Sequence, residues 1–156
     1  MNKNNNNNFE DGKDNNVNLT ILNEINKGAK MGMDSISYVL KKVNDENMKE
    51  NLSTQFCEYG KLVTKVNDLF KKYGEIPDET PFKNKMMSWT GVQLNTINNA
   101  SNSKIAEMMV QGGNMGIIEC QKLLNHNPNA EQEVKDVLNE FMTMQKNDIE
   151  QMKTFL

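Results

Sequence analysis

Acidic residues that could bind a metal are spaced along the segments expected to form four long helices. Glu24, Glu58, Glu107 and Asp148 each fall on a different one. A bundle that holds two iron ions needs carboxylates on all four helices and Glu-x-x-His on two of them, because the ions require bridging oxygens and imidazole nitrogens. The chain has one histidine, His126, and no Glu-x-x-His motif. We therefore expect no di-iron centre and no cofactor; a weak all-carboxylate metal site formed by these four residues is the alternative.

Asp148 is the acidic residue most expected to point inward, because it lies near the apolar stripe between Phe141 and Met152. A buried carboxylate needs a hydrogen-bond partner or a bound ion. We expect Asp148 to bond to Tyr59, to Gln145 or to a lysine rather than to a metal.

The residues used in nucleophilic catalysis form no recognisable set. Cys57 and Cys120 lie in expected helices without a Cys-x-x-Cys spacing, and we expect two reduced, buried thiols; a disulfide or a redox pair is the alternative. His126 is expected at the surface near a helix C-terminus, where positive charge is favourable. There is no Gly-x-Ser-x-Gly motif and no phosphate-binding glycine loop. The sequence therefore predicts that the chain is not an enzyme.

Methionine is frequent, with 12 residues. Most of them fall on or beside expected apolar stripes, where flexible side chains fill gaps in a core. Binding of Cu(I) and a peptide-binding groove are the alternatives. Met86 and Met87 are expected to be exposed beside Trp89, so these three residues are the candidates for a patch that contacts a protein partner.

Apolar residues recur at helical spacing in five segments of the chain. The expected helices cover residues 17–44, 45–74, 81–98, 103–127 and 129–156. Asp45 and Ser103 are the expected N-caps, and Gly74 is an expected left-handed C-cap. Thr80 followed by Pro81 suits a helix start, because proline fits the first helical position.

The first 16 residues are rich in asparagine and contain a single aromatic residue, Phe9. Such a segment cannot bury enough apolar surface to offset the entropy lost on ordering. We expect residues 1–16 to be a disordered tail and residues 17–156 to form one bundle domain.

The second half of the chain repeats the pattern of the first. Residues 28–32, Gly-Ala-Lys-Met-Gly, match residues 112–116, Gly-Gly-Asn-Met-Gly, and the apolar positions that follow also correspond. Two helical hairpins that bury their apolar faces against each other form an antiparallel four-helix bundle. The connection from Gly74 to Asn102 is long enough to cross the bundle and contains the short extra helix. The paired glycines indicate that the hairpins approach closely there; ligand binding by the glycines is the alternative.

Several segments also carry a family resemblance: Met86-Met87-Ser88-Trp89, Leu94, Ile97, Lys104 to Met109, Gly113 to Gly116, Leu22 to Val39 and Leu52 to Tyr73. Through them the chain resembles an uncharacterised bacterial family of ferritin-like four-helix bundles. The resemblance implies that fold and no settled activity. The family has acidic residues between the small residues of the repeated motif, where this chain has Lys30-Met31 and Asn114-Met115. This chain therefore lacks the carboxylates with which members of the family would bind a ligand.

Charge and composition argue against several classes of partner. The net charge is −3, and all 18 basic residues are lysine, so the arginine fork that recognises phosphate and guanine is missing. No apolar run reaches the roughly 18 residues of a membrane span, and the N-terminus lacks the apolar core of a secretory signal. We expect a cytoplasmic protein without a nucleic-acid partner, and we infer no small-molecule substrate.

These features together predict a non-enzymatic structural or protein-interaction bundle. We expect a homodimer that serves stress or sporulation physiology in a low-GC bacterium, as small ferritin-like proteins often do. The alternative is a degenerate ferritin-like protein that retains weak metal or redox binding.

Overall fold

The computed structural model describes the backbone of residues 7–79 and 85–156 and the side chains of residues 16–79 and 88–156. The described residues form five helices: α1 (Asn7–Leu40), α2 (Glu46–Lys72), α3 (Lys85–Thr96), α4 (Asn102–His126) and α5 (Gln132–Lys153). They contain no β-strand, which confirms the predicted all-α class. Within the same residues no helix is long and apolar enough to cross a membrane.

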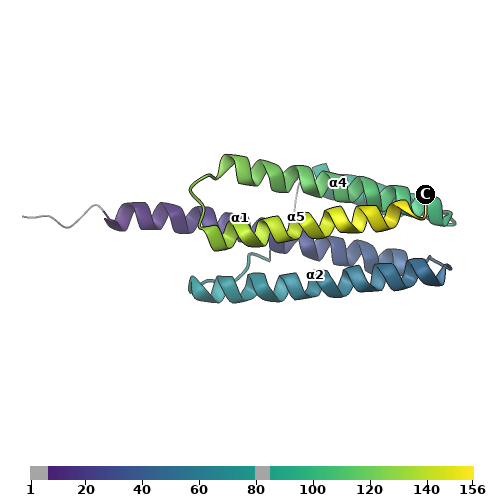
Figure 1. Cartoon of the computed structure of the whole chain (residues 1–156), viewed down its shortest axis with the longest axis horizontal. Helices are drawn as coiled ribbons and strands as arrows, with labels where there is room; N and C mark the ends of the chain where they lie inside the picture. The colour runs from purple at the N-terminus through teal and green to yellow at the C-terminus, as the bar shows by residue number, and fades with distance from the viewer. Residues whose placement is uncertain (1–6, 80–84) are drawn as a thin grey trace, which may run out of the picture.

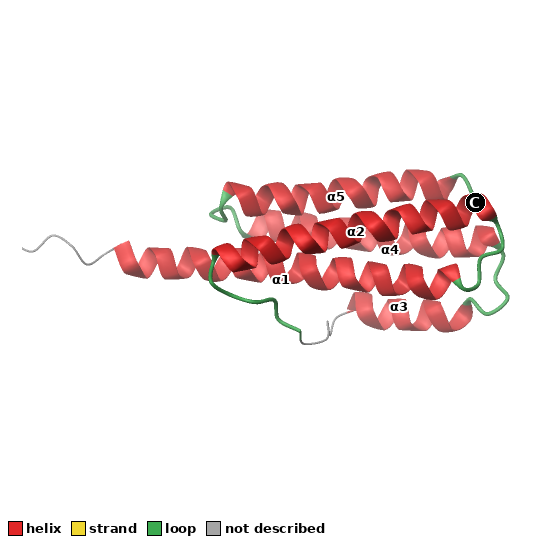
Figure 2. Cartoon of the chain, turned by 90° about the horizontal axis from the view of Figure 1, so that it is seen from below, coloured by secondary structure: helices red, strands yellow, loops and turns green. Residues whose placement is uncertain are grey.

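The four long helices lie lengthwise together as two hairpins (Figure 1). The closest packing is between α1 and α2 and between α4 and α5, and α5 also contacts both helices of the first hairpin. The short helix α3 belongs to the connection between the hairpins and lies on the outside, against α1 and α4 (Figure 2). The expected helix start at Thr80-Pro81 falls outside the described residues.

Helix α1 begins at Asn7 and continues without a break into the first hairpin. Its first turns extend past the ends of the other helices (Figure 1). Residues 1–6 of the expected tail lie outside the described residues, and residues 7–16 belong to the helix. Disorder therefore stays a prediction for residues 1–6, whereas residues 7–16 are helical.

The ends of the helices follow capping rules. Asp45 caps α2 by accepting a hydrogen bond from the backbone N–H of Met48 at 2.8 Å, as predicted. Gly74 follows α2 with a φ of 70°, which a residue with a side chain rarely adopts, and this confirms the predicted C-cap. The cap predicted for α4 was wrong. Ser101 accepts the capping hydrogen bond from the backbone N–H of Lys104 at 3.2 Å, so the helix starts at Asn102 and Ser103 lies in its first turn.

The predicted apolar stripes form one core. On α1 its members are at most 1% exposed, and on α5 at most 7%; they include Leu22, Ile25, Ile36, Val39, Val134, Leu138, Phe141, Met142 and Met152, and Val43, just after α1, is 3% exposed. Full burial of one such side chain stabilises the fold by about 1.5–3 kcal/mol relative to exposure. The stripes of the two hairpins therefore hold the bundle together.

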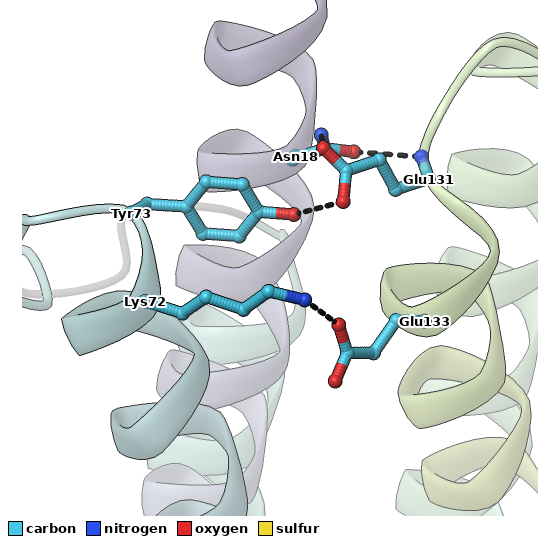
Figure 3. A network of polar contacts seen from close by, with 5 residues as sticks. All are labelled: Asn18, Lys72, Tyr73, Glu131 and Glu133. Atoms are coloured by element: carbon cyan, nitrogen blue, oxygen red, sulfur yellow. Dashed lines mark hydrogen bonds and ion pairs between the residues drawn. The ribbon is translucent and has the colours of Figure 1, made fainter.

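A network of polar contacts ties three helices together where α5 begins (Figure 3). Asn18 of α1 donates from Nδ2 to Oε1 of Glu131 at 3.1 Å and accepts from the backbone N–H of Glu131 at 2.9 Å. The hydroxyl of Tyr73 donates to Oε2 of Glu131 at 2.8 Å, and Lys72 forms an ion pair with Glu133. We call these five residues the polar clasp. It fixes the second hairpin to the end of the first.

Candidate functional site

A cavity of about 110 Å³ lies inside the bundle and is lined by residues of all five helices. Most of its wall is apolar, formed by side chains such as Ile25, Met108, Leu123, Leu138, Phe141 and Ile149. For comparison, an enclosed apolar cavity of about 150 Å³ stays dry and binds a benzene-sized molecule. The cavity of this bundle therefore has room for a small organic molecule.

The paired glycines of α1 and α4 all lie on the wall of the cavity. Each of them faces a side chain: a Cβ added to Gly28 would lie 3.2 Å from the ring of Phe141, and one added to Gly32 would lie 3.0 Å from the ring of Tyr59. At Gly116 it would lie 1.8 Å from Oε1 of Gln145. The predicted close approach of the hairpins holds for Gly28 alone, since the other glycines receive side chains from the helix or connection of their own half.

Helix α3 covers one side of the cavity. Its residues Trp89, Thr90, Gln93 and Leu94 line the wall, and the Trp89 ring lies against Gly112, where an added Cβ would be 3.2 Å from Cζ3. Glycine at this position lets the indole lie flat on α4, so it pins α3 to the bundle.

The residues predicted to contact a partner have different positions. Trp89 is half-buried and faces the bundle, whereas the side chains of Met86 and Met87 lie outside the described residues. An interaction patch formed by these three residues therefore stays a prediction.

Asp148 is the most unusual polar group of the cavity wall. It is 8% exposed, and its Oδ2 atom has no hydrogen-bond partner in the described structure. Burial raises the pKa of Asp148 to about 6, the nearby Tyr59 hydroxyl opposes this shift, and the charge of Glu58 adds to it. This effect on the pKa places Tyr59 beside Asp148, and the predicted hydrogen bond between them stays a prediction.

Tyr59 is held by the ring of Phe141, which meets it edge to face with centroids 5.9 Å apart. Burial raises the pKa of Tyr59, and the neighbouring charge of Asp148 raises it further. The Tyr59 hydroxyl is therefore a fixed, neutral donor on the cavity wall.

Gln145 and Cys120 form a second polar pair on the wall. Nε2 of Gln145 lies 3.6 Å from Sγ of Cys120 and 3.5 Å from the carbonyl oxygen of Phe141. Burial raises the pKa of the Cys120 thiol to about 11, so the thiol is neutral near pH 7 and is a poor nucleophile. Both cysteines are free, but the prediction that both are buried is wrong for Cys57, which is exposed on the outer face of α2.

Two further carboxylates, Glu24 of α1 and Glu119 of α4, line the cavity. Burial raises the pKa of Glu24, the charge of Lys27 opposes the shift, and the charge of Glu119 adds to it. With Asp148 the wall carries three carboxylates, and it includes no lysine or histidine. Lys122 pairs with Glu119 at 2.8 Å and Lys27 lies beside Glu24, so Asp148 is the wall carboxylate that no ion pair among the described residues neutralises.

The four candidate metal ligands do not gather at one place. Glu24 and Asp148 lie on the cavity wall, Glu58 is exposed, and Glu107 forms an ion pair with Lys104 at 2.8 Å. Among the described residues no group of three or more histidine, cysteine, aspartate or glutamate side chains could hold a metal ion. His126 is the last residue of α4 and is exposed, as predicted.

The sequence interpretation did not find the cavity or its polar wall. Gln55 and Gln145 are 2% and 5% exposed on stripes that are otherwise apolar, and Gln55 donates to Asn51 at 2.8 Å. Polar residues at core positions opposite glycines were the available signal, because such a pattern leaves space beside buried hydrogen-bonding groups.

Comparison with known proteins gives no relative from which a function could be transferred. No family model, no curated protein and no solved structure matches this chain. The cavity is therefore the feature of the molecule on which a proposed function rests.

Proposed function

We propose that this chain is a non-enzymatic binding protein with a ferritin-like four-helix bundle, and that it binds a small molecule in its central cavity. The observation that carries the proposal is Asp148, a buried carboxylate that lines the cavity and whose Oδ2 atom has no partner in the described structure. A buried polar atom without a hydrogen bond costs about 1–3 kcal/mol. A bound molecule that donates to this carboxylate would offset that cost.

The ferritin-like assignment is supported by the order and direction of the helices. Two hairpins are joined by a connection that carries α3, and this connection spans the bundle so that α2 and α4 run in the same direction (Figure 1). One long crossover between two hairpins distinguishes ferritin-like bundles from bundles with only short loops.

The glycines of the cavity wall determine its shape. A glycine in a helix interior costs about 1 kcal/mol relative to alanine. Five glycines of α1 and α4 line the cavity: Gly28, Gly32, Gly112, Gly113 and Gly116. A Cβ at any of them would lie 3.2 Å or less from a side chain of another helix, so these glycines make room for the side chains that form the wall.

The experiment compares ligand binding in the wild type and in a variant with a filled cavity. Ser35 lines the cavity, and its hydroxyl bonds only to the Met31 carbonyl of its own helix, at 2.8 Å. Ser35→Leu therefore adds apolar volume without breaking a contact between helices. Thr54→Leu is the matched control, because Thr54 is exposed and makes the same kind of bond to Glu50 on α2.

Thermal unfolding is followed with cyclopentanol and with cyclopentylammonium chloride as probes. We expect at least one probe to raise the Tm of the wild type and of Thr54→Leu, and to leave the Tm of Ser35→Leu unchanged, because binding to the folded state alone stabilises it. A Tm that no probe changes in the wild type, or an equal rise in Ser35→Leu, would contradict the proposal.

Other parts of the sequence interpretation are retained as proposals. The exposed Val92 on α3, with 61% of its surface accessible, supports association of two copies through this helix. The free thiols of Cys57 and Cys120 suit a reducing compartment, so we propose a cytoplasmic location. A role in stress or sporulation physiology is also retained.

A further inference from the structure

We infer that the cavity binds a small organic cation, an ammonium group on a short apolar body. The inference rests on the proposed function and names its ligand class. Three carboxylates line the cavity and no basic side chain does, while the rest of the wall is mainly apolar. This combination fits a ligand that is both positively charged and largely hydrocarbon.

Asp148 provides a hydrogen-bond acceptor on the cavity wall. The Asp148 side chain lines the cavity, and its Oδ2 atom is a buried acceptor without a donor among the described residues. An ammonium group supplies N–H donors together with the opposite charge, and such charge-assisted hydrogen bonds are about twice as strong as neutral ones. A carboxylate or phosphate ligand would place a second negative charge beside Asp148.

The aromatic rings of the wall also favour a cation. Tyr59, Phe141 and Trp89 come from three different helices and all line the cavity. Aromatic faces attract cations, more strongly when water is excluded. The rings therefore favour an ammonium group over an uncharged group of the same size, and their apolar surface accommodates its hydrocarbon part.

An organic cation fits the cavity wall better than a metal ion does. A metal ion needs several oxygen, nitrogen or sulfur ligands at coordination distance. The described residues bring no three such carboxylate, histidine or cysteine side chains together. Glu24 and Glu119 also line the cavity, but Lys27 lies beside Glu24 and Lys122 pairs with Glu119 at 2.8 Å, so Asp148 supplies the main attraction for a cation.

The ionisation of Asp148 makes this affinity depend on pH. Its pKa of about 6 means that it gains a full charge only near neutral pH, so the affinity for an ammonium group rises with pH through this value. The other ionisable groups near it are Tyr59 and Glu58 of α2, Cys120 and Glu119 of α4, and Glu24 of α1. The raised pKa values of the Tyr59 phenol and the Cys120 thiol keep both groups neutral here.

The test is calorimetric titration of the full chain with three molecules that share one ring: cyclopentylammonium, cyclopentanol and cyclopentanecarboxylate. At about pH 7.5 we expect the ammonium ion to bind at least about tenfold more tightly than the alcohol, and the carboxylate to bind most weakly. At about pH 5 the advantage of the ammonium ion should shrink, because Asp148 is then protonated.

Asp148→Asn keeps the shape of the side chain and removes its charge, so it should abolish the preference for the ammonium ion. Glu150→Gln is the matched control, because Glu150 is an exposed residue of the same helix paired with Lys153. Glu119→Gln gives a second reading if Asp148→Asn does not fold, and it should weaken the preference in part.

The outcomes separate the inference from the function on which it rests. Equal binding of the alcohol and the ammonium ion, or a preference that survives in both Asp148→Asn and Glu119→Gln, overturns the inference and leaves the binding function standing. Failure of all three molecules to bind the wild type overturns both.

Discussion

The polar clasp and the cavity lie in the same bundle but differ in whether their buried polar groups have hydrogen-bond partners. In the clasp, Asn18 is 0% exposed and both ends of its amide are hydrogen-bonded to Glu131 (Figure 3). In the cavity, Asp148 is 8% exposed and one of its oxygens has no partner. Most buried polar groups in proteins are bonded, so the clasp follows the rule and the cavity departs from it.

The two regions also differ in charge. Lys72 pairs with Glu133 in the clasp and Lys122 pairs with Glu119 on the cavity wall, whereas Asp148 forms no ion pair among the described residues. Groups that cost stability and are not compensated locally are typical of binding sites, since the rest of the fold must support them. The difference is consistent with the proposal that the clasp stabilises the bundle whereas the cavity is kept for a ligand.

Replacement of Asn18 should have the largest effect on stability. Asn18→Leu removes two hydrogen bonds between hairpins and leaves the backbone N–H of Glu131 without its acceptor. We expect the free energy of unfolding to fall by about 3 kcal/mol, measured by urea denaturation. Asn139→Leu, an exposed position of α5, is the control for the same substitution and should change stability little.

A loss of less than about 1 kcal/mol in Asn18→Leu would show that the clasp is dispensable. The contrast between a structural clasp and a functional cavity would then fail, because neither region would stabilise the fold.

Replacement of Asp148 should have the opposite sign and depend on pH. The folded protein raises its pKa from 3.8 to about 6, so the folded state holds the proton more tightly than the unfolded chain does. Stability of the wild type should therefore fall as pH rises through this interval. Asp148→Asn lacks the titrating group, and without ligand we expect it to be more stable than the wild type by about 2 kcal/mol at about pH 8.

The pH series provides its own control. At about pH 4 the protonated carboxyl of Asp148 resembles the amide of the variant, so the two proteins should unfold at nearly the same urea concentration. If Asp148→Asn is less stable than the wild type at high pH, the carboxylate has a stabilising partner, and the cavity is not the unsatisfied region described above.

The sequence was sufficient for the helices and insufficient for the cavity, for physical reasons. Helical spacing of Leu22, Ile25 and Ile36, and the caps Asp45 and Gly74, are local signals, and each of them corresponds to a feature of the structure. The cavity depends on which side chains of other helices face the glycines, and that pairing is a long-range property.

The clasp could not be predicted for a similar reason. Its central contact joins Asn18 to Glu131, residues that are far apart in the chain and that carry no motif. Asparagine near a helix start is common in this sequence, so composition gave no means of distinguishing the one that is fully buried and bonded. Asp148 was predictable because an acidic residue on an apolar stripe is an exception that a single helix already reveals.

Replacement of Asn26 should have the smallest effect on stability, and it gives the most direct comparison with Asn18. Asn26 lies on the same helix as Asn18 and is 1% exposed, but neither its amide nitrogen nor its amide oxygen has a hydrogen-bond partner in the described structure. Removal of a buried, unbonded amide relieves its desolvation cost, so Asn26→Leu should raise the free energy of unfolding by about 1 kcal/mol while Asn18→Leu lowers it. Urea denaturation of both variants measures the two signs directly. A loss in Asn26→Leu as large as that in Asn18→Leu would mean that ordered water satisfies Asn26, and burial without a protein partner would then no longer distinguish the two regions of the bundle.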